Sequence, residues 1–154
     1  MANFDENDAP ALWNPKAAIW LSALLLPLGP ILHHLNWKAL GKDKEAKKAK
    51  EWAIGFCVAQ IISFLPFIPP VAGYSLIGVW LVWGWGLFSK KTFEKAREKG
   101  QPMATGKEQV DYVAEKYGTE YKRKSWLVPG IAVACYMLPF FALGVLDGLD
   151  EILE

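Results

Sequence analysis

The sequence lacks most of the residues on which enzymatic and metal-binding signatures depend. It has two histidines and two cysteines among 154 residues, and its formal net charge is only +1. A net charge so close to zero gives no basic field for nucleic acid. Cys57 and Cys135 each lie in an apolar stretch, where packing explains them better than a disulfide. With no Cys-x-x-Cys pair, His-Glu-x-x-His motif, glycine-rich phosphate loop or nucleophile–base pair, we predict no enzyme, no metal and no cofactor.

Charge is also missing from four long stretches of the chain. No Asp, Glu, Lys or Arg occurs in residues 17–35, 52–70, 71–88 and 126–146. A membrane-spanning helix needs about 20 residues, which is close to the length of each run. A water-soluble bundle would show a polar stripe on every helix, and these runs have none. The sequence therefore predicts an all-α fold, a polytopic membrane helical bundle that forms a single domain over residues 1–154.

The basic residues predict how this bundle is oriented. Sixteen of the seventeen lysines and arginines fall in two loops, residues 36–51 and 89–125, and only Lys16 lies elsewhere. Basic loops stay in the cytoplasm. Both acidic tails, and a tight proline-rich turn at residues 66–70 between the second and third runs, are then expected outside.

The first run allows a second topology, because Pro27, Gly29 and Pro30 interrupt its middle. Proline breaks a helix interior. The run could cross the membrane in full, or it could enter and leave the same face as a shallow re-entrant hairpin. The hairpin would leave three true spans and put the N-terminus in the cytoplasm.

Both basic loops are expected to contain helix. Residues 36–51 are rich in Lys, Ala and Glu, which favour helix and would extend the second run into the cytoplasm. In the other loop, Thr105 and Glu108 match a capping box and Gly118 matches a helix terminator. These signals predict a helix over residues 106–117, whose apolar face carries Val110, Val113, Ala114 and Tyr117. This amphipathic helix would lie on the membrane surface or pack against the ends of the spans.

Few residues in the runs are candidates for function. Gln60 is the one strongly polar residue expected at membrane depth, where an unpaired amide is costly. We interpret it as a contact between helices, with a substrate or ion contact as the alternative. The small residues that would let helices pack closely are Gly55, Ala59, Ser63, Gly130 and Ala134. The residues expected at the membrane–water interface are His33, His34, Trp83, Trp85 and Trp126.

Three stretches of the sequence resemble a group of small, uncharacterised bacterial inner-membrane proteins. They are residues 14–22 (NPKAAIWLS), 30–41 (PILHHLNWKALG) and 112–129 (YVAEKYGTEYKRKSWLVP). The resemblance implies a multi-pass protein of the bacterial inner (cytoplasmic) membrane and no particular activity. Some members of the group carry a soluble domain ahead of the first stretch, which would favour a cytoplasmic N-terminus.

Together these features predict a non-enzymatic membrane accessory protein. It would contact the lipid bilayer and bind a membrane-protein partner or a second copy of itself, in a stress-linked or toxin-protective role, without nucleic acid. The alternative is a subunit of an oligomeric channel or small transporter, since four helices alone enclose little volume.

Overall fold

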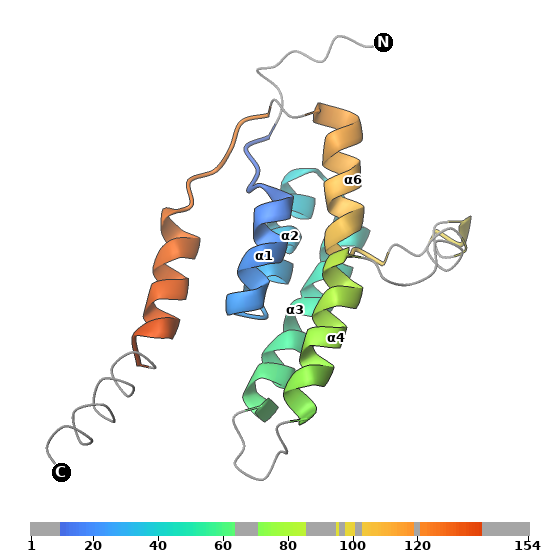
Figure 1. The fold of residues 1–154 in the computed structure, drawn as a ribbon. Coiled ribbons are helices and arrows are strands. Elements are labelled where there is room, and N and C mark those ends of the chain that lie inside the picture. Colours follow the sequence, from blue (N-terminus) through green and yellow to red (C-terminus); the bar gives the residue numbers. More distant parts are fainter. Residues whose placement is uncertain are drawn as a thin grey trace, which may run out of the picture. The chain divides into compact units, whose positions relative to one another are not determined.

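The fold is all-helical, as the sequence predicts, in the part of the chain that the structure describes. A computed structural model describes residues 10–63, 71–85, 95, 98–100, 103–118 and 121–139, with the backbone alone for 71–75. The chain divides into two compact units, Met1–Lys124 and Ser125–Glu154. The first unit contains α1 (Pro15–Leu24), α2 (Leu28–Ala39), α3 (Asp43–Ser63), α4 (Val71–Trp85) and α6 (Gly106–Tyr117) (Figure 1). In the second unit, residues 127–139 are helical.

The first apolar run, residues 17–35, folds as two helices. Asn14 caps α1, because its side-chain oxygen accepts hydrogen bonds from the backbone N–H groups of Lys16 and Ala17 at 3.0 and 3.3 Å. The helix ends before Pro27, whose ring cannot continue a helix, and α2 starts directly after it. The interpretation of this run as one continuous spanning helix is therefore wrong, and the chain breaks at the predicted prolines.

The two halves of this run form a hairpin that depends on a glycine. A Cβ atom at Gly29 of α2 would lie 2.6 Å from Ser22 Cβ and 2.7 Å from the carbonyl oxygen of Ala18, both on α1. Real Cβ atoms do not approach other atoms so closely, so only glycine allows the two helices to pack at this distance. Ser22 is itself fully buried and donates its hydroxyl to the carbonyl oxygen of Ile19 at 2.6 Å.

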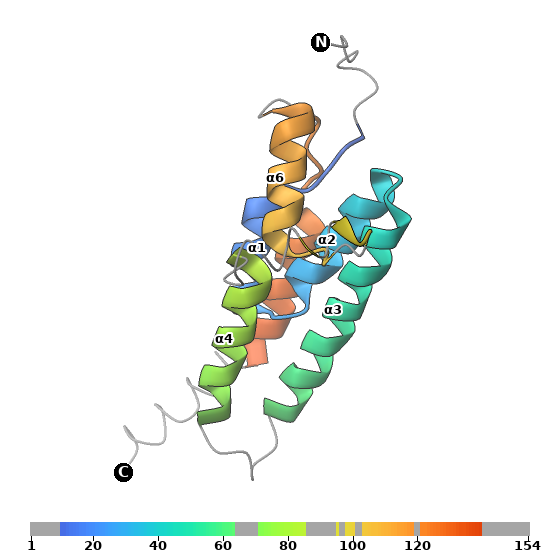
Figure 2. The same ribbon diagram turned by 90° about the vertical axis from the view of Figure 1, so that its right-hand side faces the viewer.

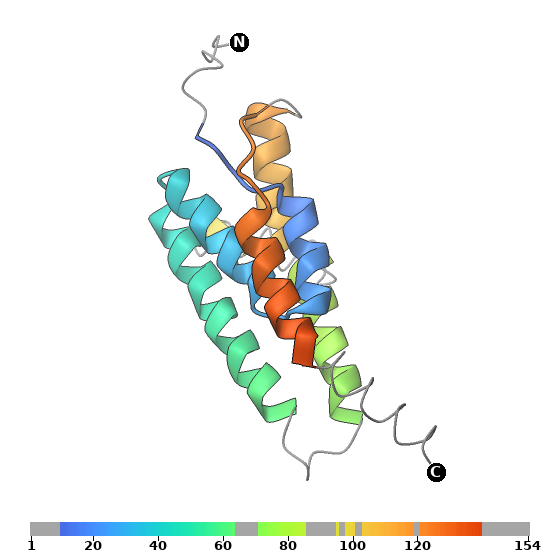
Figure 3. The same ribbon diagram turned by 90° about the vertical axis from the view of Figure 1, so that its left-hand side faces the viewer.

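The predicted helical extension of the second run is confirmed. After α2, a turn through Gly41 (φ +67°) reverses the chain, and the Lys42 N–H donates to the Trp37 carbonyl oxygen at 3.0 Å. α3 then continues without interruption from the basic segment into the apolar run. Figures 2 and 3 show α4 running back from the far end of α3. The predicted turn at residues 66–70 lies outside the described residues, as do the tails at 1–9 and 140–154.

None of the helices within the described residues combines the length and the apolar character that a membrane span requires.

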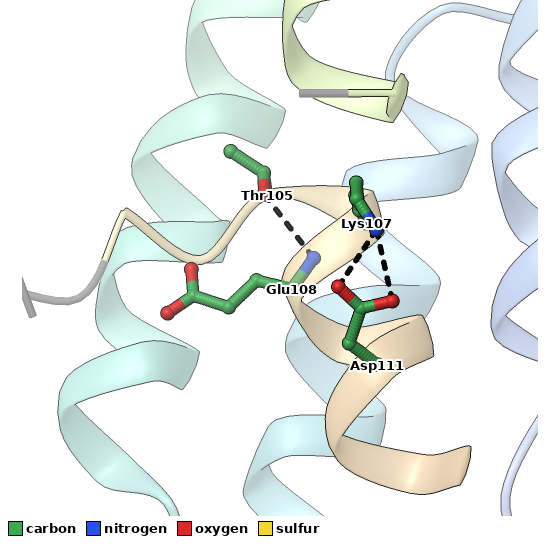
Figure 4. A network of polar contacts seen from close by, with 4 residues as sticks. All are labelled: Thr105, Lys107, Glu108 and Asp111. Carbon is green, nitrogen blue, oxygen red and sulfur yellow. Dashed lines mark hydrogen bonds and ion pairs between the residues drawn. The ribbon is translucent and has the colours of Figure 1, made fainter. Parts of the chain in front are cut away.

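The helix predicted at residues 106–117 is confirmed with both of its ends. Thr105 Oγ1 accepts a hydrogen bond from the Glu108 N–H at 3.3 Å, and Gly118 adopts φ +65° at the C-terminus (Figure 4). This helix, α6, packs against α1, α2 and α4. The predicted apolar face is partly wrong, because Ala114 is exposed. The buried face consists of Gly106, Gln109 and Val113. A polar side chain thus lies at the centre of this contact.

Two hydrophobic clusters fill the interior of the first unit. One gathers Ile19, Phe56, Trp80 and Trp83, and the other gathers Trp37, Ala46, Ala49 and Ala104. Ile19 joins three helices, because a Cβ atom at Gly84 of α4 or at Gly106 of α6 would lie within 3.0 Å of its side chain. Figures 1 and 2 accordingly show α6 beyond the C-terminal end of α4.

The surface of the first unit divides into two parts of opposite character. We call residues 17–35, 52–63 and 76–85 the apolar half, and residues 36–51 and 103–118 the charged half. Every exposed residue of the apolar half is apolar, and this half contains no Asp, Glu, Lys or Arg. Its exposed residues include Trp20, Leu24, Ile31, Leu35, Ile54, Val58, Ile61, Ile62, Ile77, Val79 and Trp85. The exposed residues of the charged half are mostly lysines, aspartates and glutamates.

Candidate functional site

A buried network of side-chain amides joins the two halves. Asn36 of α2 and Gln109 of α6 are fully buried, and Asn36 Nδ2 donates to Gln109 Oε1 at 3.1 Å. Asn36 also binds the N-terminal segment, since Oδ1 accepts from the Trp13 N–H at 3.0 Å and Nδ2 donates to the Trp13 carbonyl oxygen at 2.8 Å. Gln109 Nε2 donates to the carbonyl oxygen of His33 at 2.9 Å. Every bond pairs a donor with an acceptor, so both amides are oriented unambiguously.

This network was not predicted, because its members are far apart in the sequence. Asn36 and Gln109 are separated by 73 residues, and Gln109 and His33 by 76. A single polar residue on a helix gives no signal that its partner lies on another helix. The one indication is that Gln109 stands three and four residues from Gly106 and Val113, which share its buried face.

His33 lies inside the protein, although an interfacial position was expected. It is fully buried, and its Nε2 lies 3.1 Å from the Pro15 carbonyl oxygen. A carbonyl oxygen only accepts, so Nε2 carries the proton and donates it. The ring meets Trp83, also fully buried, edge to face at a centroid distance of 5.1 Å. Other residues of the chain therefore enclose both side chains and separate them from lipid headgroups and water.

The other aromatic and histidine candidates lie nearer the surface. His34 is half-buried, with Nδ1 2.8 Å from the Ala46 carbonyl oxygen. Trp85 is exposed and meets exposed Trp20 edge to face, with 5.5 Å between the ring centroids. Trp126 belongs to the second unit and precedes its helix. Within the described residues, no three His, Cys, Asp or Glu side chains gather closely enough to hold a metal ion.

Gln60 and the predicted packing residues do not form a site. Gln60 is half-buried on α3, and its backbone carbonyl accepts the Ser63 hydroxyl at 2.7 Å. Gly55 is exposed, and no described atom lies within 4 Å of a Cβ placed there; the same holds at Gly130. Ala59 is half-buried and Ala134 exposed. Among described residues, a Cβ atom would come within 3.0 Å of another helix at Gly29, Gly84 and Gly106 instead. The sequence identifies Gly29 only as part of a helix break.

Two tryptophan side chains hold helices together, Trp80 within the apolar half and Trp52 between the two halves. Trp80 Nε1 donates to the Ile19 carbonyl oxygen at 3.1 Å and to Ser22 Oγ at 2.8 Å, which ties α4 to α1. Trp52 Nε1 donates to the Met103 carbonyl oxygen at 3.0 Å, which fixes the segment before α6 on α3. These bonds satisfy indole N–H groups that would otherwise be buried without acceptors.

The charged half also contains a pocket. A pocket of about 340 Å³ opens where α2, α3 and α6 meet. Its lining residues are Trp37, Lys42, Lys44, Glu45, Gly100, Glu108 and Tyr112. Figure 4 shows the Glu108 carboxylate on the opposite side of α6 from the exposed Lys107–Asp111 ion pair.

On the exposed surface of the charged half, lysine side chains interact with neighbouring carboxylates and tyrosines. The Lys48 ammonium, 2.6 Å from Glu51 Oε2, lowers the pKa of the Glu51 carboxyl by its hydrogen bond. The pKa of Lys116 is raised, chiefly by its hydrogen bond with Tyr117. Exposed pairs of this kind contribute little to stability.

No protein-family model matches the chain, and neither a curated protein nor a solved structure matches it.

Proposed function

We propose that the chain is a non-enzymatic accessory protein of the bacterial inner membrane, held in the bilayer by its apolar half with its charged half in the cytoplasm. In this proposal the second and third apolar runs cross the membrane. The first run enters from the cytoplasmic side and returns. The lipid bilayer and a membrane-protein partner are its binding partners.

One observation carries the proposal, and it is the inverted surface of the apolar half. Its exposed side chains are apolar, while polar Ser22 and His33 are fully buried within it. A helix in water has the reverse arrangement, with charged residues on the outer face. Apolar side chains exposed on four helices favour a contact with lipid or with another protein. Lipid accounts for exposure on several helices at once, because lipid surrounds a helical bundle.

Helix lengths support a re-entrant first run. α1 has 10 residues and α2 has 12. At about 1.5 Å per residue each reaches about 15–18 Å, roughly half of the hydrocarbon core of about 30 Å. The second and third runs continue in sequence beyond the described parts of α3 and α4, which gives each enough apolar residues to cross.

The buried amide network supports an accessory role over catalysis or transport. The amides of Asn36 and Gln109 are occupied by each other and by backbone groups. Buried polar groups that satisfy one another stabilise a fold and leave no donor or acceptor for a substrate. The two amides would then have a structural role and take no part in binding a substrate.

Cysteine accessibility tests the membrane placement. In a Cys57→Ala, Cys135→Ala background, Lys47→Cys reports on the charged half and Ile61→Cys on the apolar half. With an impermeant reagent, we expect Lys47→Cys to react only after the cells are opened. Ile61→Cys should resist labelling until detergent dissolves the membrane. Labelling of Ile61→Cys in opened cells without detergent would contradict the proposal.

The accessory role is tested by the mass of the complex extracted in mild detergent. We expect a defined stoichiometric complex with a different membrane protein. A homo-oligomer without another protein would instead support a channel. The variant Gln60→Leu sharpens the distinction, since loss of a helix contact lowers stability by about 0.6–2 kcal/mol. In a conducting path, the same change would abolish transport without loss of stability.

A further inference from the structure

The pocket in the charged half is not used by the proposed membrane anchoring or by the buried amide network. Its volume of about 340 Å³ is at the lower end of the range for ligand sites, which suits a small polar group. It is bordered by the end of α2, the beginning of α3 and one face of α6.

The pocket lining offers hydrogen-bond donors. Trp37 is only 2% exposed, and its Nε1 has no hydrogen-bond partner among the described residues. An indole N–H can only donate, so its missing partner is an acceptor such as an oxygen. Lys42 and Lys44 line the same pocket at the N-terminus of α3. The positive end of the helix dipole adds to their charge. These three donors suit an anionic oxygen.

The pocket lining also carries negative charge. Glu45 and Glu108 also line the pocket, so two carboxylates balance two ammonium groups. A simple anion would be attracted by one pair and repelled by the other. The Tyr112 ring packs on Trp37 at 5.2 Å and has Lys42 Nζ 5.3 Å from its centroid. Aromatic faces and carboxylates together favour a cation.

We propose that this pocket binds a zwitterionic group in which a phosphate is linked to a primary ammonium. The phosphate oxygens accept from the Trp37 indole N–H and the two lysines. The ammonium faces Glu45 and Glu108. The same chemistry occurs in a phosphoethanolamine lipid headgroup and in soluble phosphoethanolamine; the lipid source rests on the proposed membrane location, and the soluble source does not.

The test follows the Trp37 indole N–H directly by NMR of ¹⁵N-labelled protein in a maltoside detergent, which has no phosphate. The Trp37→Phe variant identifies the signal, and Trp20→Phe, outside the pocket, controls for loss of an indole. We expect O-phosphoethanolamine to shift the Trp37 signal. Lys44→Gln and Glu45→Gln should each weaken binding about tenfold, while Lys47→Gln, an exposed lysine outside the pocket, should leave it unchanged.

The controls distinguish the phosphate group of the ligand from its ammonium group, and a lipid ligand from a soluble one. Inorganic phosphate or ethanolamine binding as tightly as O-phosphoethanolamine would overturn the zwitterionic site, and so would an unmoved Trp37 signal. In nanodiscs, a shift with phosphatidylethanolamine and none with phosphatidylglycerol supports a lipid ligand. A shift with the soluble compound alone supports the site with a soluble ligand. Because that titration needs no bilayer, it remains decisive even where the cysteine labelling rejects membrane insertion.

Discussion

The apolar and charged halves of the first unit have similar backbones and opposite surfaces. Both consist of helices packed around tryptophan-centred clusters, one containing Trp80 and Trp83 and the other Trp37. In the charged half, alanines and an aromatic ring are buried while lysines face outward, as in proteins that fold in water. In the apolar half, Ser22 and His33 are buried while isoleucines and tryptophans face outward. The two interiors are thus alike, and in the proposed membrane location the two surfaces match two solvents, lipid for the apolar half and water for the charged half.

The largest effect is expected at the junction of α2, α6 and the N-terminal segment, which the buried amide network holds together. Replacing Asn36 by Leu keeps the volume approximately and removes three hydrogen bonds. Gln109 Oε1, which is fully buried, and the half-buried Trp13 N–H and carbonyl would each lose a hydrogen bond. A buried group left unsatisfied costs about 1–3 kcal/mol. We expect a loss of about 3 kcal/mol or more in the free energy of unfolding, measured by chemical denaturation. A loss below about 1 kcal/mol would mean that water reaches this junction.

How much of this architecture the sequence could predict depends on the range of the interactions involved. The ends of α6 are encoded locally, by Thr105 and Gly118, and the break between α1 and α2 by Pro27. These features were predicted because the residues act on their own neighbours. The burial of His33 and the pairing of Asn36 with Gln109 depend on contacts between distant helices. One sequence without aligned relatives carries no signal of such contacts.

The contrast between the apolar and the charged surface can be tested by exchanging an apolar and a charged residue between them. Ile61 on α3 is 66% exposed and lies in a run that contains no charged residue. If residue 61 faces the hydrocarbon core, Ile61→Lys should lower the stability by about 2.5–3.5 kcal/mol. If it faces water, the stability should change by no more than about 0.5 kcal/mol. We expect the larger loss, seen as reduced thermal stability in nanodiscs. Lys47→Ile, the reverse change on the exposed charged surface of the same helix, should have little effect.

Two glycines test where helices approach each other closely. Gly29→Ala places a Cβ atom against Ser22 and the Ala18 carbonyl, and overpacking of this kind costs about 1–3 kcal/mol. Gly55→Ala has open space among the described residues. It should be neutral or stabilise by up to about 1 kcal/mol through helix propensity. Thermal unfolding of both variants is the measurement. If Gly55→Ala lowers the melting temperature more than Gly29→Ala does, Gly55 has the predicted packing role and Gly29 is not a site of close helix packing.

The smallest predicted effect concerns the α6 N-terminus and separates local from tertiary stabilisation in the charged half. Thr105 is fully buried and its hydroxyl caps the helix through the Glu108 N–H. Loss of such a cap in Thr105→Ala should cost about 1 kcal/mol. Thr105→Ser, which keeps the hydroxyl, should recover most of that loss. The matched control is Lys107→Gln, which breaks the exposed Lys107–Asp111 pair and should cost only about 0.3–0.5 kcal/mol. Hydrogen exchange over residues 106–117 localises each effect. If Thr105→Ala and Lys107→Gln cost the same, the helix start is held by tertiary contacts of Trp52 and Ile19, and its cap adds nothing measurable.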